Sequence, residues 1–212
     1  MRLFSYCVQT DDGAAPNPFF GACTLVICKP RIRLVAERGD WVLGTGSKIA
    51  PQGDLSGRVV YAMRVDQAMP MKDYDSFARR HLPGKLPDPQ ARDWRRGLGD
   101  AIYDFRTSPP TIRLGVHTVL NRARDLSGRN ALISRYYWYF GASGPRLPPT
   151  LRQLAQQRPG HRSLKNDPFK KAFVAWIHRQ GPRGVRGHPQ GVPTGASTCS
   201  PTPKKDLNRR AC

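Results

Sequence analysis

The 212-residue sequence lacks a long apolar run. The longest, Ala22–Cys28, contains Thr24 and is far shorter than the roughly 20 residues that a helix needs to cross a bilayer. Met1–Cys7 is too short, and is followed by too polar a stretch, to form a secretory signal. We therefore expect a protein that makes no membrane contact and stays in the cytoplasm.

Metal-binding and nucleotide-binding signatures are also missing. The five cysteines are an odd set without CxxC spacing, which argues against a disulfide framework and a zinc finger. The histidines show neither HExxH nor the HxE…CxxC pattern of zinc deaminases, and the P-loop spacing GxxxxGK[ST] is absent. No metal site is predicted, and the sequence does not indicate which cofactor, if any, is used.

Acidic residues are scarce: 15 Asp and Glu face 35 Lys and Arg, which gives a net charge of +20. The excess is concentrated in residues 142–212, where 14 basic residues face two acidic ones. Clustered cations release condensed counterions from polyanions, so DNA or nucleotides are the expected partners. The alternative is a solubilising tail without a specific partner.

Hydrophobic periodicity predicts an α+β fold, with a mixed or barrel-like sheet and C-terminal helices packed on it. A domain over residues 1–187 is expected to precede a disordered basic tail over 188–212, which is too poor in apolar residues to fold. Residues 125–128 are interpreted as a turn. Strands are predicted at residues 3–9, 24–28, from 41, 59–66 (with one wetter face), 101–105, 112–121 and 131–140, and helices at 30–37, 74–80, from 150 and from 168.

The segment Ser5–Thr24 contains the most unusual loop. Two prolines flank Asn17 and restrict its backbone, so its amide is a candidate to read a base edge. Asp12 is a candidate general base and Cys23 a candidate nucleophile, although buried structural cysteines are commoner than activated thiolates. The alternative is a tight structural loop in which aspartate forms the turn.

A second candidate segment is Gly39–Lys48, where glycines and hydroxyls follow a predicted strand. Such a turn can direct backbone N–H groups at an anion, and Lys48 adds a charge. A hairpin turn without a ligand is the alternative.

Aromatic residues dominate the third segment, Arg135–Phe140. Alternation along a strand places Tyr137 and Tyr139 on one face and Tyr136, Trp138 and Phe140 on the other, so one set at most can line a pocket while the other packs in the core. Rings near an arginine suit base stacking, whereas core packing is the alternative.

Basic side chains toward the C-terminus are the phosphate-binding candidates. His161 is a further candidate acid, base or phosphate donor, although a lone exposed histidine more often has no such role. Phe169, Phe173, Trp176 and Ile177 recur at helical spacing and are expected to pack on the sheet. The phosphate candidates are Arg162, Lys170, Lys171, Arg179, Arg183 and Arg186.

The sequence contains five recognisable motifs: SYCVQTDDGAAPNPFFGACTLVICKPRIR, GDWVLGTGSK, RVVYAMRV, GDAIYDF and RYYWYFG. They resemble the second family of nucleotide modification associated domains, which are proposed to work in DNA base hypermodification in phages and bacteria. Matching positions are Asp12, Pro16, Asn17, Pro18, Cys23, Thr24, Lys29 and Pro30, followed by Gly39, Asp40, Trp41, Gly44 and Ser47. The resemblance runs from Met1 to about His188 and departs at Ala101, where the family has an asparagine, so a ligand contact of that asparagine is not carried over.

The resemblance implies a protein that recognises, or helps to modify, a base in such a system, with other base-modification proteins as further partners. It adds Lys29, Trp41 and Ser47 to the base- or nucleotide-binding candidates. A fold-level analogy also exists with the small β-barrels of the PUA and EVE kind, which hold modified bases. Two rival functions stay open: a nucleotide-modifying enzyme that uses Asp12 or Cys23, and a basic interaction protein without a small-molecule pocket.

Overall fold

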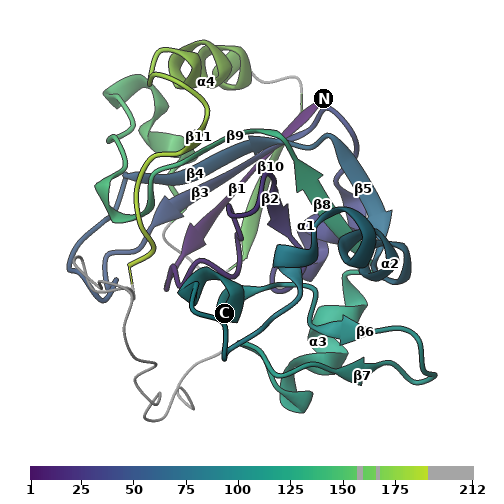
Figure 1. Ribbon diagram of the computed structural model, residues 1–212. Coiled ribbons are helices and arrows are strands. Elements are labelled where there is room, and N and C mark those ends of the chain that lie inside the picture. The colour runs from purple at the N-terminus through teal and green to yellow at the C-terminus, as the bar shows by residue number, and fades with distance from the viewer. Residues whose placement is uncertain (157–159, 166–167, 191–212) are drawn as a thin grey trace.

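The computed structural model describes residues 1–156, 160–165 and 168–190. It has the α+β fold that the sequence predicts (Figure 1). An open six-stranded sheet has the order β10-β1-β3-β4-β9-β11, and it is mixed because β1 pairs with β3 in parallel while β3 pairs with β4 antiparallel. Its strands are β1 (Arg2–Val8), β3 (Trp41–Gly46), β4 (Val59–Arg64), β9 (Tyr136–Tyr139), β10 (His161–Lys165) and β11 (Gly184–Val185).

A second sheet has three antiparallel strands in the order β2-β8-β5, and a third pairs β6 with β7. These strands are β2 (Cys23–Leu25), β5 (Gln67–Pro70), β8 (Asn130–Ser134), β6 (Tyr103–Asp104) and β7 (Thr111–Ile112). The α-helices are α1 (Pro30–Val35), α2 (Met71–His81), α3 (Arg122–Ser127) and α4 (Pro168–His178). Short 3₁₀ helices are η1 (Pro83–Lys85), η2 (Trp94–Leu98), η3 (Val119–Asn121), η4 (Gly141–Ser143) and η5 (Pro149–Leu154).

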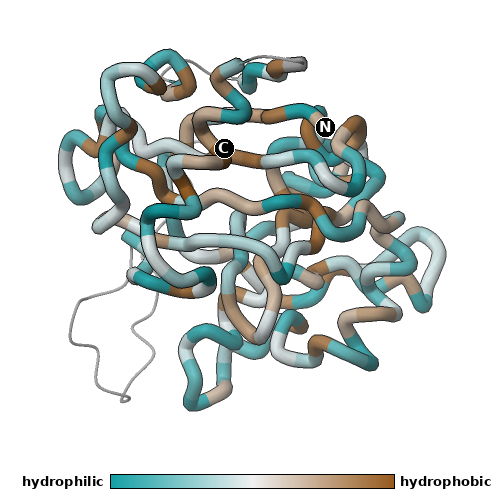
Figure 2. Tube along the Cα trace, turned by 90° about the horizontal axis from the view of Figure 1, so that it is seen from above, coloured by the Kyte–Doolittle hydropathy of each residue, from teal (hydrophilic) through white to brown (hydrophobic). Residues whose placement is uncertain are grey.

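Hydrophobic clusters lie between the layers of the fold. One lies between the six-stranded and three-stranded sheets, a second between the three-stranded sheet and α2, and a third between the other face of the large sheet and α4 with η5. Figure 2 shows hydrophobic segments in the interior strands and many hydrophilic ones around the rim. Representative pairs across the three clusters are Phe4 with Leu25, Tyr74 with Ile133, and Trp41 with Phe173.

Strand β9 confirms the predicted alternation. Tyr137 and Tyr139 belong to the cluster between the two sheets, whereas Tyr136 and Trp138 face the cluster beneath α4. Because α4 covers that second face, its Phe173 and Ile177 are fully buried, as the helical spacing predicts. The face carrying Tyr137 and Tyr139 is therefore the one that turns toward the Pro-Asn-Pro loop.

The prediction of one wetter face for the strand at 59–66 is wrong. Residues Val59–Met63 are all buried, because β4 is a central strand covered on both sides. A small and a large side chain alternate here because the two faces of β4 leave different space. Ala62 packs beneath α4, whereas Tyr61 packs between the two sheets.

Two further strand predictions are wrong in detail. The run 131–140 is divided at Arg135 into β8 and β9, which belong to different sheets, and the N–H of Arg135 donates to Asp66 Oδ2 at 2.6 Å. Of residues 112–121, Ile112 alone belongs to a strand, as the last residue of β7, and Val119–Asn121 form η3. The predicted turn at 125–128 lies mostly in α3.

The last residues that the structure describes pack against the fold. Gln190 is buried, and its N–H donates to the carbonyl of Asp11 at 2.8 Å while Gln52 Nε2 donates to the carbonyl of Gln190. Gln190, which lies in the segment expected to be a tail, therefore contacts the domain expected to end at residue 187. The remainder of the expected tail lies outside the described residues.

Candidate functional site

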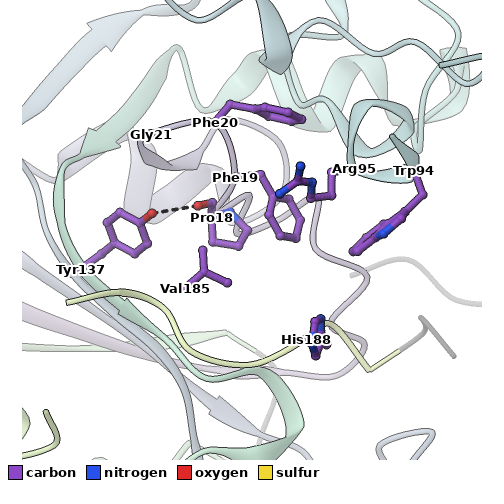
Figure 3. A pocket seen from close by; sticks show the side chains of 9 residues that line it. All are labelled: Pro18, Phe19, Phe20, Gly21, Trp94, Arg95, Tyr137, Val185 and His188. Atoms are coloured by element: carbon purple, nitrogen blue, oxygen red, sulfur yellow. Dashed lines mark hydrogen bonds between the residues drawn. The ribbon is translucent and has the colours of Figure 1, made fainter. Parts of the chain in front are cut away.

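A pocket of about 300 Å³ opens beside the Pro-Asn-Pro loop (Figure 3). It is formed where that loop meets η2, strand β9 and the segment around β11, so residues far apart in the sequence meet at one place. Its lining residues are Pro18, Phe19, Phe20, Gly21, Trp94, Arg95, Tyr137, Val185 and His188.

Four of the nine lining residues are phenylalanine, tryptophan or tyrosine. The rings of Phe19 and Trp94 meet edge to face, with centroids 5.5 Å apart, and Phe20 approaches Phe19 at 6.3 Å. Phe19 is buried, whereas Phe20 and Trp94 are half-buried and form the open edge. Arg95 lies at the same edge, with its guanidinium carbon 5.7 Å from the Phe20 ring centre and an ion pair to Asp93.

Tyr137 and Pro18 hold the loop against the sheet. The Tyr137 hydroxyl donates to the Pro18 carbonyl at 2.9 Å, and the dashed line in Figure 3 marks this bond. Since Tyr137 is among the candidates from the aromatic strand, the structure joins two of the segments that the sequence indicates.

Asn17 is fully buried, and its side chain is engaged by the fold. Its Nδ2 donates to the carbonyl of Leu98 at 2.8 Å, and its backbone exchanges two hydrogen bonds with Thr24. Lys85, also fully buried, donates to the carbonyl and Oδ1 of Asn17 and to the carbonyl of Ala22. The amide therefore positions the loop, and Pro18 and its neighbours face the pocket.

A buried carboxylate complements the buried lysine. Asp100 accepts from Thr24 and from Tyr74, whose hydroxyl lies 2.7 Å from Oδ1. Burial lowers the pKa of Lys85 to about 8, and burial raises the pKa of Asp100. Through these bonds, β2 and the loop are held to η1 and to the residues that follow η2.

Two acidic residues precede the loop. Tyr139 donates to the buried Asp11 at 2.7 Å, and burial raises the pKa of Asp11 to about 7. Asp12, a candidate general base, accepts from the N–H of Ala14 at 2.9 Å. Tyr139, a candidate for base contact, is fully buried beneath the pocket, with its ring 6.4 Å from that of Phe19.

Cys23, the candidate nucleophile, begins β2 and is fully buried between the sheets. Burial strongly raises the pKa of its thiol, so the protonated form predominates at neutral pH. The structure thus places Cys23 in the core, apart from the pocket lining.

The second candidate segment does not contribute to the pocket lining. Trp41 is buried beneath α4, stacked on Trp138 at 6.2 Å. Ser47 is buried and accepts from the N–H of Ile49, and Lys48 is exposed.

Lys29 and His161 lie near the β1–β10 edge. The ammonium of Lys29 lies 4.7 Å from the ring centre of Tyr6, and His161 packs against Phe4 with centroids 6.1 Å apart. Burial, with Arg31 as a further cause, lowers the pKa of His161. The structure does not bring these residues together with the pocket lining.

The candidate phosphate ligands are distributed over two regions. Arg162 donates to the carbonyl of Gln153, and the buried Lys170 donates to that of Met1. Arg183 and Arg186 are exposed and border Val185, which lines the pocket. Lys171 and Arg179 are exposed in or just after α4.

Arg183 also stacks on the first ring of the aromatic strand. Its guanidinium carbon lies 4.3 Å from the ring centre of Tyr136, and that of Arg64 lies 4.2 Å from the same ring. Tyr136 is thus an arginine-flanked ring on the face opposite to Tyr137.

Several residues of the pocket lining are not among the candidates that the sequence indicates. Phe19 and Phe20 follow the Pro-Asn-Pro loop directly, and their position there was the available signal. Trp94 and Arg95 lie in a proline-rich segment, where no periodicity reveals the short helix. Among the residues that the structure describes, no group of three His, Cys, Asp or Glu side chains is placed to hold a metal ion, and no helix is long and apolar enough to cross a membrane.

Comparison with known proteins bears directly on the family. Neither the curated proteins nor the solved structures include a significant match. The family model described as nucleotide modification associated domain 2 matches residues 1–196, which is most of the chain and includes every pocket residue. The protein belongs to the nucleotide modification associated domain 2 family, and this membership associates it with the modification of nucleotides or bases.

Proposed function

We propose that this protein binds a nucleotide, or a base turned out of DNA, in the pocket beside the Pro-Asn-Pro loop, as part of a base-modification system. The observation that carries the proposal is the open aromatic edge made by Phe20 and Trp94, with Arg95 beside it. Base stacking on aromatic rings contributes roughly 1–3 kcal/mol per base and suits such a surface.

The dimensions of the pocket favour a single base. Small-molecule sites usually have volumes of roughly 300–1,000 Å³, so this pocket is at the small end of that range. A nucleobase in the pocket would leave its sugar and phosphate outside. For DNA, the base must then leave the stack to reach Trp94 and Phe19.

One exposed cation is placed to hold a phosphate near the opening. Arg95 is in the lining, whereas Arg183 lies over Tyr136 on the opposite face of β9 and Arg186 donates to the carbonyls of Gln180 and Pro182. Residues 191–212 contribute four further basic residues against one acidic residue, and the chain leaves the described fold at Gln190, which is bonded to Asp11. This charge supports DNA as a partner, since neutralised phosphates release counterions.

Binding is proposed here in preference to catalysis by Cys23. That thiol is fully buried, and its raised pKa keeps it protonated. A nucleophile needs a reachable thiolate, which the pocket lining does not contain.

Thermal unfolding with free canonical and modified nucleotides tests the proposal. A ligand present at about 100 times its dissociation constant stabilises the folded state by roughly 2.7 kcal/mol, so the binding nucleotide will raise the melting temperature. If neither the nucleotides nor single-stranded oligonucleotides that carry the same bases raise it, the pocket does not bind bases and the proposal fails.

A further inference from the structure

A cysteine, a histidine and an aspartate form a hydrogen-bonded series outside the pocket described above. Cys28 Sγ lies 3.6 Å from Nε2 of His117, and Nδ1 of the same ring lies 2.6 Å from Oδ2 of Asp125. Cys28 follows β2, His117 precedes η3 and Asp125 lies in α3, so tertiary folding brings the three together. The order thiol, imidazole, carboxylate is that of a nucleophile, its base and the group that orients the base.

The carboxylate is fixed on both oxygens. Asp125 is fully buried; its Oδ1 accepts from the N–H of Cys28 at 3.0 Å, and Oδ2 accepts from the hydroxyl of Tyr103 at 2.9 Å. A carboxylate at Nδ1 favours the tautomer with hydrogen on that nitrogen, which leaves Nε2 of His117 to accept the thiol proton.

The site lies just beneath the surface. The side chain of His117 is 14% exposed and Cys28 is 3% exposed, so the imidazole is the more accessible of the two groups. Cys28 has φ +60° and the next residue, Lys29, has φ +41°, both in the left-handed region that residues other than glycine rarely adopt. This backbone conformation is held by the bonds that Asp125 and Arg33 make to Cys28.

A buried cation lies beside the backbone of Cys28. Arg33 donates from Nε to the carbonyl of Cys28 at 2.8 Å and also donates to the carbonyls of Asp125 and Asn130. Burial lowers its pKa to about 10, so the guanidinium remains charged at neutral pH. A fixed positive charge near a cysteine stabilises its thiolate.

We propose that Cys28 is the nucleophile of an acyl-transfer site, with His117 as its general base and Asp125 as the residue that positions the imidazole. The substrate class is a small ester or thioester. The proposal is independent of base binding in the pocket, because none of the three residues is part of its lining.

The reaction consumes only the acyl donor and water. Sγ attacks the carbonyl carbon while its proton passes to Nε2 of His117; the S–C bond forms, the bond from carbon to the leaving oxygen or sulfur breaks, and the proton on Nε2 goes to that leaving atom. Water then attacks the thioester carbon and gives a proton to Nε2. The Cys28 thiolate leaves and recovers this proton, so an acid and an alcohol or thiol are released.

The full chain with p-nitrophenyl acetate as the acyl donor tests the proposal. We expect a burst of about one equivalent of p-nitrophenol, with the acetyl group found by peptide mass spectrometry on Cys28. Cys28→Ser should lose the burst, and His117→Gln should acetylate Cys28 about 100-fold more slowly, because general bases contribute typically 10²–10⁴-fold. Cys7→Ser is the matched control, since Cys7 is a buried free cysteine on β1, and it should keep the burst.

Two results would overturn the proposal. One is an acetyl group that maps to other residues and not to Cys28 in the unmodified sequence, a measurement that needs no variant to fold. The other is a Cys28 acetylation rate in His117→Gln that equals the original rate while the melting temperature is retained.

Asp125→Asn tests the positioning role through the pH profile. Asparagine presents an N–H or an oxygen to the ring and no charge, so the imidazolium of His117 loses stabilisation and the base becomes neutral at lower pH. The midpoint of Cys28 acetylation should therefore move to lower pH. If the substitution changes the melting temperature but leaves the pH midpoint in place, Asp125 has only a structural role. That result would overturn the positioning role given to Asp125. The charged or titratable groups around the thiol are His117, Asp125, Arg33, Lys29, Tyr6 and Tyr103.

Discussion

The hydroxyl of Tyr139 donates a 2.7 Å hydrogen bond to Oδ2 of Asp11, and this bond connects the aromatic strand to the chain that enters the Pro-Asn-Pro loop. Asp11 is fully buried, and burial raises its pKa to about 7, with the charge of Asp12 as a smaller cause in the same direction. The backbone of Asp11 also accepts from Gln190. The protonation state of Asp11 therefore affects a residue that contacts both the aromatic strand and the segment around Gln190.

Asp11→Asn should raise stability at pH 8 and have little effect at pH 4. The pKa of Asp11 is near 3.8 in the unfolded chain and about 7 in the fold, so the fold binds the extra proton between these values. Stability from this proton is complete below pH 4 and is lost as the pH rises to 7. Asparagine resembles the protonated acid, and the difference at pH 8 should be a few kcal/mol, since one pKa unit corresponds to roughly 1.4 kcal/mol.

Urea unfolding of both chains from pH 4 to pH 8 measures this difference. Subtracting one curve from the other cancels the titration of the histidines, which both chains share. A difference in unfolding free energy that stays constant over this range would show that Asp11 keeps an ordinary pKa in the fold. Asp54→Asn is the matched control, because that aspartate is exposed.

Lys85→Met should destabilise the fold by about 3 kcal/mol or more. The substitution leaves the carbonyls of Asn17 and Ala22 and the Oδ1 of Asn17 without their donor, and leaves the charge of the buried Asp100 uncompensated. Chemical denaturation at pH 7 gives the change in unfolding free energy. Lys72→Met, at an exposed position of α2, should change it by less than about 0.5 kcal/mol; equal effects of the two substitutions would refute the anchoring role of Lys85.

The sequence predicts the local parts of the candidate site and misses the contacts that long-range folding creates. Alternation correctly groups Tyr137 with Tyr139 on one face of the strand, although it does not tell which face meets the loop. However, the Asn17 amide is buried, because the distant Lys85 and Leu98 surround it. Neither Lys85 nor Leu98 belongs to a sequence pattern that predicts this contact.

The same limit applies to Trp94 and Cys28. Trp94 becomes a pocket residue because η2 is folded back onto the loop, a contact between positions about 75 residues apart, and no local period encodes it. Cys28 contacts His117, which lies in a run that the sequence pattern predicts to be a strand. The structure has no strand at that position. Spatial assembly, and not residue type, distinguishes Cys28 from Cys23.

Trp94→Ala should weaken nucleotide binding about tenfold to 100-fold, because a stacked base loses roughly 1–3 kcal/mol when its aromatic partner is removed. Trp94 is half-buried at the open edge, so the fold should persist. Calorimetric titration with the nucleotide that gives the largest thermal shift measures the affinity. Trp176→Ala, which removes an equal ring outside the pocket lining, should bind the nucleotide normally. The same loss of affinity in both variants would mean that the substitutions act through the stability of the fold and not through base stacking.

Ending the chain after Gln190 should flatten the salt dependence of DNA binding without lowering the melting temperature. Gln190 is kept because it is buried and bonded to Asp11 and Gln52, so a chain that ended at residue 187 would remove contacts as well as charge. The deleted residues 191–212 hold four basic residues, and each phosphate contact contributes about −0.9 to the slope of log affinity against log salt. The slope should therefore become less steep by about 2 to 4, as measured by fluorescence anisotropy from 50 to 200 mM salt. Replacing the same four residues by glutamine in the full chain should give the same slope; an unaltered slope in both would assign the DNA contacts to the folded part, where Arg95, Arg183 and Arg186 are exposed.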